Sequence, residues 1–432
     1  MKRRLAVCLL FFLALPVFAQ VQQKRGLTLD DIFGRDADWA GVSLQGLTWS
    51  ADGSAFFYVD KDADGKTRSI YRESVADGDR AVIVDGRSLR VAGGEPIAVT
   101  GFDVSADGKR FLIAGSPRPA NFRYVSPPAD KQYYLYNTEA RTLRPLSGLT
   151  GWQRNAKLSP DGTKAGFTRD GNLFVVDLGS GLETQLTVDG SENILNGQSR
   201  GFGADGWSWS PDGRRILYMR VDQSEVRAFP LVDYLSPYPK VHWTKYPKAG
   251  DTNWKLKVGV LDLETRKTTW LQLGPDTDVY FPGLDWTRNP TQVAVQRLNR
   301  LQNKLELLFA DVTTGATRVV LTETDPCWVR VDDDLAFLKG GDRFVWSSQR
   351  SGYLHAYLYD YDGRVLNQVT SGDWEMSSAR SPRAILGVDE ANGWLYFTGK
   401  KDGVVEEHVY RVRLDGQGVQ RLSTHSRKYG NV

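Results

Sequence analysis

The chain has 432 residues, and its 55 lysines and arginines nearly balance 52 aspartates and glutamates, for a formal net charge of +3. Charges of both signs are interspersed, which excludes the basic surface expected of a protein that binds nucleic acid or an anionic membrane. Aromatic residues make up 11% and glycine is frequent (43 residues), whereas methionine is scarce (3 residues), a balance that favours strands and tight turns.

The first nineteen residues have the layout of a secretory signal peptide. Residues 2–4 form a basic start, residues 5–18 are almost wholly apolar, and the bond between Ala19 and Gln20 is a plausible cleavage site. The apolar stretch is short for a membrane span, and a retained N-terminal anchor is the alternative. We therefore predict a periplasmic or secreted protein whose mature form has a net charge near zero and is not membrane-bound.

One short phrase recurs along the first half of the chain: an aromatic or apolar residue, a serine, and a turn that ends in Asp-Gly. It occurs as Trp-Ser-Ala-Asp-Gly at 49–53, Val-Ser-Ala-Asp-Gly at 104–108, Leu-Ser-Pro-Asp-Gly at 158–162 and Trp-Ser-Pro-Asp-Gly at 209–213. Successive glycines lie 55, 54 and 51 residues apart, and weaker versions follow at 286–289 and 340–342. Asp-Gly between apolar runs predicts a β-hairpin, because glycine accepts the positive φ of the turn.

A short strand is predicted after each phrase, over residues 55–59, 110–114, 165–168, 216–220, 293–297 and 344–347. Second hairpins, in which alternating runs flank a polar turn, are predicted over residues 173–186, 305–321, 357–369 and 409–422. Two hairpins in each unit of about fifty residues make a four-stranded sheet. Radial packing of such sheets gives a β-propeller.

The sequence therefore predicts an all-β fold, a β-propeller of four-stranded blades with seven blade units over residues 46–424. Residues 20–45 are expected to form a lead-in and residues 425–432 a C-terminal tail. A string of small β-sandwich domains is the alternative, but no linker rich in Pro, Ser or Thr separates the units. The fourth unit is longer than the others, and its proline- and tyrosine-rich stretches at 232–235 and 246–250 are expected to project as an ordered flap.

The long fourth unit also carries a family resemblance. Tyr-Pro-Lys-Ala-Gly at 246–250 and Trp-Ser-Trp-Ser-Pro-Asp-Gly at 207–213 resemble the propeller of dipeptidyl peptidase IV and its bacterial relatives in the prolyl oligopeptidase family. Further similarities are the Arg-, Asn- and Gln-rich stretch at 298–303, Gly-Tyr-Leu-His at 352–355 and Gly-Asp-Trp-Glu at 372–375. The resemblance runs in order from about residue 26 to residue 424.

The resemblance implies an eight-bladed propeller that caps an α/β-hydrolase domain with a Ser-Asp-His triad. Such a propeller restricts access and holds the free amino end of the substrate with one arginine and two adjacent glutamates. Arg123 matches the arginine, and its five donors suit a substrate carbonyl; an ordinary surface arginine is the alternative. The glutamates have no counterpart, because Asp205 is the one carboxylate in residues 196–206 and a single aspartate is a weak substitute.

No catalytic residue is predicted in this chain. The single Gly-x-Ser-x-Gly match is at 197–201, but three glycines soon follow Ser199, and these cannot open the helix that a nucleophile elbow requires. The hydrolase domain implied by the family would follow residue 423, where only a basic tail remains. A frameshift, a split gene or a natural truncation would each account for this ending.

Neither a metal nor a cofactor is predicted. The four histidines are isolated in sequence and show no metal-ligand spacing: His242, His355, His408 and His425. Cys8 belongs to the signal peptide, so Cys327 is the one cysteine of the mature chain and no intramolecular disulfide is expected. Beside Trp328, Cys327 is predicted to be a small buried hydrophobic residue.

Two functional hypotheses follow. In the first, the chain is the N-terminal propeller portion of a dipeptidyl peptidase IV-like serine peptidase, which gates and anchors the substrate but is not catalytic by itself. Its partners would be a peptide substrate or a separate hydrolase domain, and the family implies a homodimer. In the second, the chain is a stand-alone periplasmic propeller that binds peptide or protein partners. The reduced glutamate site favours the second hypothesis, and the remaining family pattern favours the first.

Overall fold

The computed structural model describes residues 45–91, 96–117, 130–148, 151–200, 205–234, 237–331, 334–377 and 383–424. The chain divides into two units, residues 1–43 and 44–432, and all described residues belong to the second. The signal peptide, nearly all of the lead-in, and the tail lie outside the described residues. In the part of the chain that the structure describes, no helix has the length and apolar character needed to cross a membrane.

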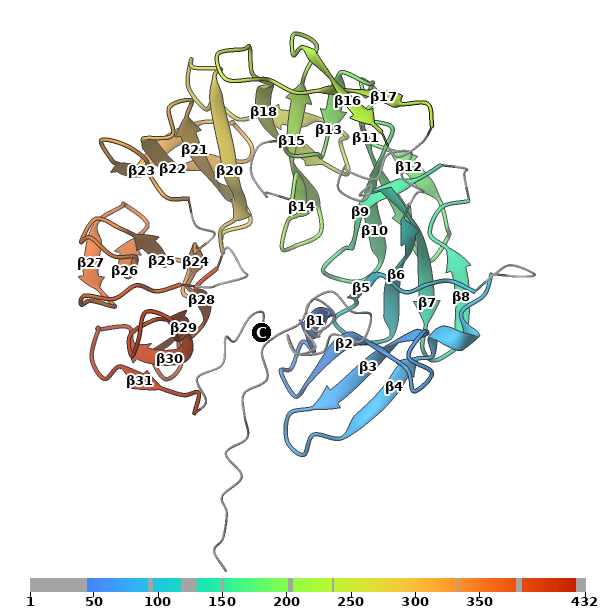
Figure 1. The fold of residues 1–432 in the computed structure, drawn as a ribbon, viewed down its shortest axis with the longest axis horizontal. Coiled ribbons are helices and arrows are strands. Elements are labelled where there is room, and N and C mark those ends of the chain that lie inside the picture. Colours follow the sequence, from blue (N-terminus) through green and yellow to red (C-terminus); the bar gives the residue numbers. More distant parts are fainter. Residues whose placement is uncertain are drawn as a thin grey trace, which may run out of the picture. The chain divides into compact units, whose positions relative to one another are not determined.

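Antiparallel sheets follow one another around a common centre, and the first strand of each lies nearest to that centre (Figure 1). Blade I has the order β1 (Gln45–Trp49), β2 (Ala55–Lys61), β3 (Arg68–Ser74), β4 (Arg80–Val84). A 3₁₀ helix, η1 (Gly86–Ser88), follows it.

Blades II and III share one eight-stranded sheet, because β7 pairs with both β6 and β9. Blade II consists of β5 (Gly101–Val104), β6 (Arg110–Pro117), β7 (Asp130–Asn137) and β8 (Thr142–Pro145). Blade III consists of β9 (Gln153–Leu158), β10 (Lys164–Arg169), β11 (Asn172–Asp177) and β12 (Glu183–Gln185).

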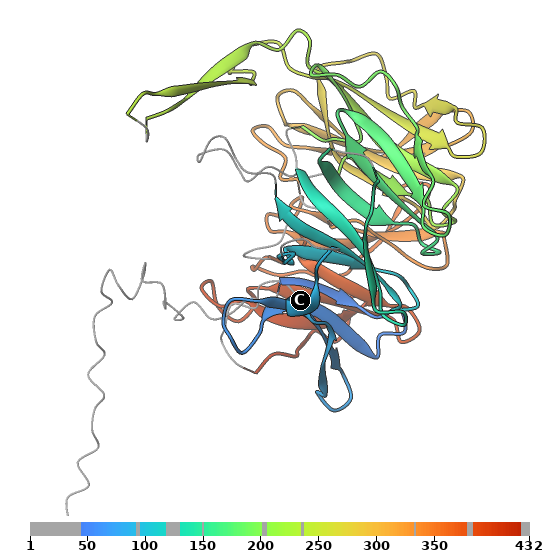
Figure 2. The ribbon, with the colours of Figure 1, turned by 90° about the vertical axis from the view of Figure 1, so that its right-hand side faces the viewer.

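Blade IV differs from the others because two short strands, β13 (Ile194–Asn196) and β14 (Trp207–Trp209), share the innermost place. Both pair with β15 (Arg215–Asp222), which is followed outward by β18 (Lys255–Asp262) and β19 (Thr268–Trp270). Between β15 and β18 the chain forms a separate hairpin, β16 (Ala228–Asp233) and β17 (Lys240–Lys245). Figure 2 shows this hairpin extending away from the blades, as expected for the flap.

Blades V, VI and VII are regular four-stranded sheets. Their strands are β20 (Val279–Trp286), β21 (Gln292–Asn299), β22 (Lys304–Asp311), β23 (Thr317–Thr324); β24 (Ala336–Phe337), β25 (Arg343–Ser348), β26 (His355–Asp360), β27 (Val365–Gln368); and β28 (Ile385–Asp389), β29 (Trp394–Gly399), β30 (His408–Arg413), β31 (Gln420–Arg421). The predicted all-β propeller of four-stranded blades is therefore confirmed, and the strands of the described residues group into the seven units expected.

The Ser-x-Asp-Gly phrase forms the same turn in the first four blades. In blade IV, Ser210 Oγ donates to Asp212 Oδ1 (2.6 Å) and accepts the N–H of Arg215 (2.8 Å). The N–H of Gly213 donates to the carbonyl of Ser210 (2.9 Å), and Gly213 has a φ of +67°. Glycine adopts this conformation without the strain that a Cβ would add. The phrase thus sets where the first hairpin of each blade reverses.

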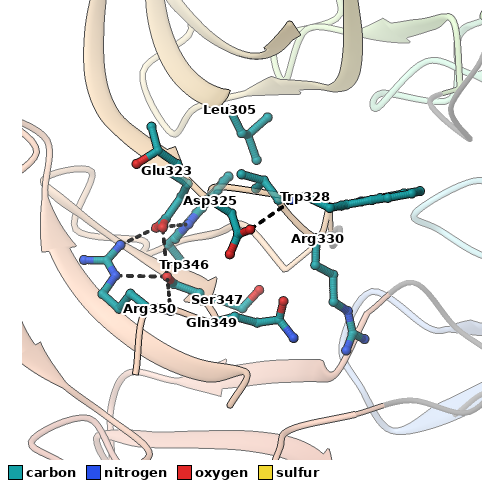
Figure 3. A pocket seen from close by; sticks show the side chains of 12 residues that line it. Leu305, Glu323, Asp325, Trp328, Arg330, Trp346, Ser347, Gln349 and Arg350 are labelled. Carbon is teal, nitrogen blue, oxygen red and sulfur yellow. Dashed lines mark hydrogen bonds and ion pairs between the residues drawn. The ribbon is translucent and has the colours of Figure 1, made fainter. Parts of the chain in front are cut away.

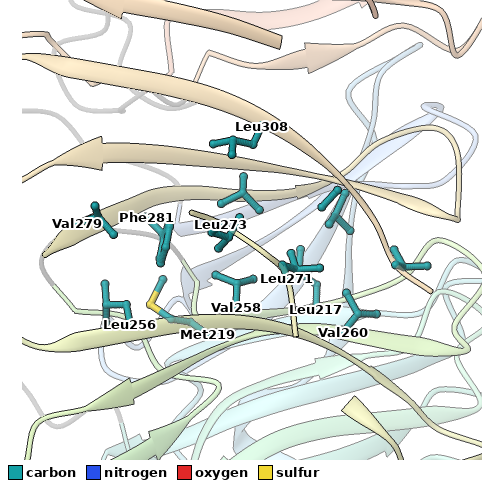
Figure 4. Close-up of a cluster of buried hydrophobic side chains, with 14 of the residues drawn as sticks. Leu217, Met219, Leu256, Val258, Val260, Leu271, Leu273, Val279, Phe281 and Leu308 are labelled. Atoms are coloured by element: carbon teal, nitrogen blue, oxygen red, sulfur yellow. The ribbon is translucent and has the colours of Figure 1, made fainter. Parts of the chain in front are cut away.

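Hydrophobic cores lie between neighbouring blades. Between blades IV and V, Met219 and Val258 pack in one cluster with Phe281 and Val295 (Figure 4). Burying each such side chain stabilises the fold by about 1.5–3 kcal/mol. Adjacent blades therefore hold each other in place, as expected of a repeat architecture.

Candidate functional site

The innermost strand of blade IV is interrupted. β13 and β14 pair with opposite ends of β15, and residues 197–206 leave the sheet between them. We call residues 197–206 the inner loop; of these, 197–200 and 205–206 are described. Met219 closes the base of the inner loop, because its carbonyl accepts the N–H of Gly197 and its N–H donates to the carbonyl of Gly206, each at 2.8 Å.

Two glycines make this closure sterically possible. Gly197 and Gly206 have φ values of +70° and +78°. A Cβ on Gly206 would lie 2.7 Å from the carbonyl oxygen of Gly197, and a Cβ on Gly197 would lie 2.7 Å from a methyl group of Leu173. Because both distances are too short for a real Cβ, the strand can leave and rejoin the sheet here only with glycine at both positions.

Strand β9 of blade III contacts the inner loop from the side. Arg154 Nη1 donates to Gln198 Oε1 (2.9 Å), and Asn155 Nδ2 donates to the carbonyl of Asp205 (2.6 Å). Lys157 Nζ lies 2.7 Å from Asp205 Oδ2. The inner loop is therefore held near both of its ends by one neighbouring strand.

Asp205 and Arg123 were the residues predicted to bind substrate. The side chain of Asp205 is 74% exposed on the inner loop, and its carboxylate forms the ion pair with Lys157. A cationic group of a ligand would have to share this carboxylate with Lys157. Arg123 lies outside the described residues, so both assignments stay predictions.

Arg200 is a residue that sequence reasoning did not single out. Its Nη1 donates to the carbonyl of Ser199 (3.1 Å), and no carboxylate of the described residues forms an ion pair with it. Burial lowers the pKa of the Arg200 guanidinium, and the nearby positive charge of Arg154 lowers this pKa further. The sequence did offer one indication that Arg200 could bind a ligand, because the inner loop contains this arginine and only one acidic residue.

Ser199 belongs to the Gly-x-Ser-x-Gly match. It follows the three-residue strand β13 and lies inside the inner loop, just after the closure at Gly197. A nucleophile elbow would place the serine between a strand and a helix. In residues 194–200 and 205–209 the structure has strands β13 and β14 on either side of the loop instead.

Two buried histidines lie beside hydroxyl groups. His408 Nδ1 is 2.9 Å from Ser423 Oγ, and its Nε2 is 3.2 Å from Glu406 Oε2. In blade VI, His355 Nδ1 is likewise 3.1 Å from Thr370 Oγ1, and burial lowers the pKa of His355. Because the same contact recurs in successive blades and both imidazoles are buried, we assign it a structural role, linking the third strand of a blade to the segment after the fourth. No group of three metal-binding side chains occurs among the described residues.

A pocket lies between blades V and VI (Figure 3). At its side, Glu323 accepts hydrogen bonds from Trp346 Nε1 (3.2 Å) and Ser348 Oγ (3.0 Å), and it forms an ion pair with Arg350. Burial acts to lower the pKa of Arg350, but Glu323 and Tyr359 together outweigh this effect and the pKa is raised. The pocket is lined by Leu305, Glu323, Thr324, Asp325, Trp328, Val329, Arg330, Trp346, Ser347, Ser348, Gln349 and Arg350.

A turn at the rim of this pocket places Cys327 differently from the prediction. Asp325 Oδ1 accepts the N–H groups of Cys327 (2.7 Å) and Trp328 (2.9 Å), which is an Asx turn. The turn presents both side chains to solvent: Cys327 is exposed and Trp328 is 66% exposed. Figure 3 shows Trp328 projecting away from Glu323. The prediction of a buried Cys327 is therefore wrong.

The two candidate sites, the pocket and the inner loop, differ in whether their charged side chains already have partners in the protein. In the pocket, Glu323 already has three partners from the protein, which indicates a structural role. In the inner loop, most donors of Arg200 have no protein acceptor among the described residues. The inner loop is therefore the stronger candidate for ligand binding.

Comparisons with known proteins agree with this fold and place it in a family. The family profile described as the dipeptidyl peptidase IV (DPP IV) N-terminal region matches residues 105–431. The chain belongs to this family. It is a DPP IV-like propeller region.

The similar curated proteins include two probable dipeptidyl-aminopeptidases. A probable dipeptidyl-aminopeptidase B of Talaromyces marneffei is 26% identical in an alignment 449 positions long, gaps included, which covers 92% of this chain and 48% of that protein. The protein of the same description from Coccidioides posadasii (strain C735) is 29% identical in an alignment 354 positions long, gaps included, which covers 74% of this chain and 37% of that protein. The chain thus spans about half the length, or less, of these relatives.

Solved structures that are similar to the chain include two dipeptidyl peptidase structures. The crystal structure of Porphyromonas gingivalis dipeptidyl peptidase 4 has a TM-score of 0.80 at 26% identity, covering 93% of this chain and 56% of that one. A putative dipeptidyl aminopeptidase IV from Bacteroides ovatus has a TM-score of 0.64 at 22% identity, covering 88% of this chain and 53% of that one. The second similarity concerns the fold alone.

Proposed function

We propose that this propeller binds peptides for a DPP IV-like serine peptidase, where it gates access and anchors the substrate without cleaving it. The observation that carries the proposal is the inner loop. It replaces part of an inner strand with polar side chains, and β9 holds it at both ends. Irregular loops fixed on a regular scaffold are where repeat proteins and other rigid folds place binding residues.

The non-catalytic role is supported by what the candidate catalytic side chains do. His355 and His408 contact Thr370 and Ser423 inside their own blades. Ser199 belongs to a loop closed between two strands rather than to a strand-to-helix turn. These positions support structural and binding roles for the described histidines and for Ser199.

Two assays on the purified chain test this function. In fluorescence anisotropy, labelled tetrapeptides with a range of N-terminal residues should include members that bind saturably, and absence of binding by all of them would contradict the proposal. A chromogenic Xaa-Pro substrate should show no turnover. Turnover that Ser199→Ala abolishes would show that the chain is an enzyme by itself.

A stand-alone peptide-binding or protein-binding propeller is the second candidate function. It is favoured by the ion pair between Lys157 and Asp205, which occupies the one carboxylate of the inner loop. The coding sequence downstream of codon 432 separates the two. A frame that encodes Gly-x-Ser-x-Gly, then Asp, then His would support the peptidase, and a frame without them would support the stand-alone binder.

We also propose that two copies of the chain associate through the flap hairpin β16–β17. Its exposed aromatic side chains include Tyr238 (86% exposed) and Trp243 (68% exposed). Sedimentation velocity should detect a dimer that is weakened by Tyr238→Ser with Trp243→Ser and unaffected by the control Trp328→Ser. A monomer at all concentrations would contradict this proposal.

Finally, we propose that the chain acts in the periplasm or outside the cell, because of its basic start and the apolar stretch that follows. N-terminal sequencing of the protein expressed with its leader should find Gln20 as the first residue. An uncleaved cytoplasmic product would contradict export.

A further inference from the structure

The two charged side chains of the inner loop differ in whether the described residues supply an oppositely charged partner. Its sequence contains one arginine, Arg200, and one acid, Asp205, and the four residues between them carry no charge. Lys157 Nζ neutralises Asp205 at 2.7 Å. Arg200 has no such partner among the described residues. Arg200 therefore gives the inner loop a positive charge that no acid of the described residues offsets.

A second guanidinium, that of Arg154, lies close enough for its positive charge to act on Arg200. Arg154 reaches the inner loop from β9 through its bond to Gln198, two positions before Arg200. Arg200 is partly buried, and among the described residues one of its five N–H donors has an acceptor, the carbonyl of Ser199. A desolvated cation beside a like charge is unfavourable unless an anion offsets it. An incoming carboxylate would accept from the free donors of Arg200 in charge-assisted hydrogen bonds.

We propose that Arg200, with Arg154 beside it, binds a carboxylate of the peptide ligand. This inference rests on the proposed peptide-binding function and names the ligand class, which is peptides that carry a carboxylate near the bound end. The carboxylate can come from an acidic side chain or from a free C-terminus. The same positive charges disfavour a ligand that offers only an ammonium group, so the site selects against such peptides as well.

Three fluorescein-labelled tetrapeptides of one length supply the test. The first has a glutamate side chain and a C-terminal amide, the second has neutral side chains and a free C-terminal carboxylate, and the third is neutral with a C-terminal amide. Fluorescence anisotropy should show that at least one carboxylate peptide binds wild-type protein about 10–100-fold more tightly than the neutral amide. Whichever carboxylate peptide binds tightly identifies the source of the carboxylate.

Variants connect this preference to Arg200. Arg200→Gln should remove the preference, whereas Arg200→Lys should keep part of it because the charge remains. Arg343→Gln, which changes an exposed arginine of blade VI, should leave it unchanged. Equal binding of all three peptides, or a preference that survives Arg200→Gln, would overturn the inference while the peptide-binding function stands. If no peptide binds, the proposed function itself fails.

A salt titration of peptide binding to the wild-type protein tests the same inference without any variant, so it applies even if a variant does not fold. Binding of the carboxylate peptide should weaken with added NaCl more steeply than binding of the neutral amide, because salt screens the guanidinium charges. Equal slopes for the two peptides would overturn the inference. Circular dichroism of each variant identifies those that are folded.

Discussion

Arg169 and Arg200, on neighbouring blades, show how the same side chain serves two purposes. The side chain of Arg169 is 6% exposed and forms an ion pair with Glu183, which is 12% exposed. It also donates to Ser147 Oγ (3.2 Å) and lies over the ring of Phe174 at 4.2 Å from the centroid. Every interaction of this guanidinium is made within blade III and the segment before it.

Arg200 has a different environment. It is partly desolvated, the positive charge of Arg154 acts on it, and its hydrogen bond goes to the adjacent carbonyl of Ser199. A buried charge that has its counterion contributes to a defined structure, and removing one partner is strongly destabilising. A desolvated charge without a counterion does not stabilise the fold and remains available to a ligand. The free energy of unfolding of variants can therefore distinguish the structural role of Arg169 from the ligand-binding role of Arg200.

The largest predicted effect is on Arg169. Arg169→Gln leaves Glu183 buried without its counterion and should lower the free energy of unfolding by about 3 kcal/mol. Arg200→Gln should not lower it, because no ion pair is lost and an unfavourable desolvated charge is removed. Urea unfolding followed by tryptophan fluorescence measures both. Equal losses in the two variants would contradict the comparison.

A second prediction extends the comparison to carboxylates. Glu323→Gln weakens the bonds to Trp346, Ser348 and Arg350 and should lower the free energy of unfolding by about 2 kcal/mol, since the pair is partly exposed to solvent. Asp205→Asn should change it by about 0.5 kcal/mol or less, because its side chain is 74% exposed. The same urea experiment applies. A larger loss for Asp205→Asn would assign that residue to the fold rather than to the ligand.

A third prediction concerns the closure of the inner loop. Gly206→Ala should lower the free energy of unfolding by about 1–2 kcal/mol, because the added Cβ meets Gly197 and the φ is positive. Gly53→Ala is the matched control, since its φ of +70° is similar but nothing lies within 4 Å of the added Cβ. Peptide affinity should fall in Gly206→Ala alone. Equal affinity in both variants would show that the ligand does not contact the inner loop.

The smallest predicted effect is the pH dependence of the blade turns. Hydrogen bonds from Ser50 and then Ser54 lower the pKa of Asp52 to about 2. Because the folded pKa lies below the unfolded value of about 3.8, the stabilisation is complete above that value and is lost as the pH falls toward 2. Between pH 4 and pH 2 the melting temperature of Asp52→Asn should fall less than that of the wild type. Parallel curves would show that these turns do not titrate as described.

Local patterns predicted most of the fold. The Asp-Gly turns fixed strand positions to within one or two residues in blade IV, where 216–220 was expected and β15 spans Arg215–Asp222. Such turns need only contacts within the phrase, as those of Ser210 show. Cys327 was placed wrongly because its exposure follows from the Asx turn at Asp325, which the alternation of apolar residues does not reveal.

The candidate site was predicted only in part. The sequence shows that the inner loop has one acid, and Asp205 was named for that reason. The sequence does not show that Lys157 forms an ion pair with Asp205, or that Arg154 lies close to Arg200. Each of these contacts joins residues more than forty positions apart. Nor does it show that Met219 closes the loop, since that depends on how β15 pairs with two separate strands.

Charge reversal at one position tests the central claim most directly. Isothermal titration calorimetry would compare a glutamate-containing and a lysine-containing tetrapeptide amide, both N-acetylated, on the wild-type protein and on Arg200→Glu. We predict that the wild type binds the glutamate peptide more tightly and that Arg200→Glu binds the lysine peptide more tightly. The same order of affinities in both proteins would contradict a carboxylate site at Arg200.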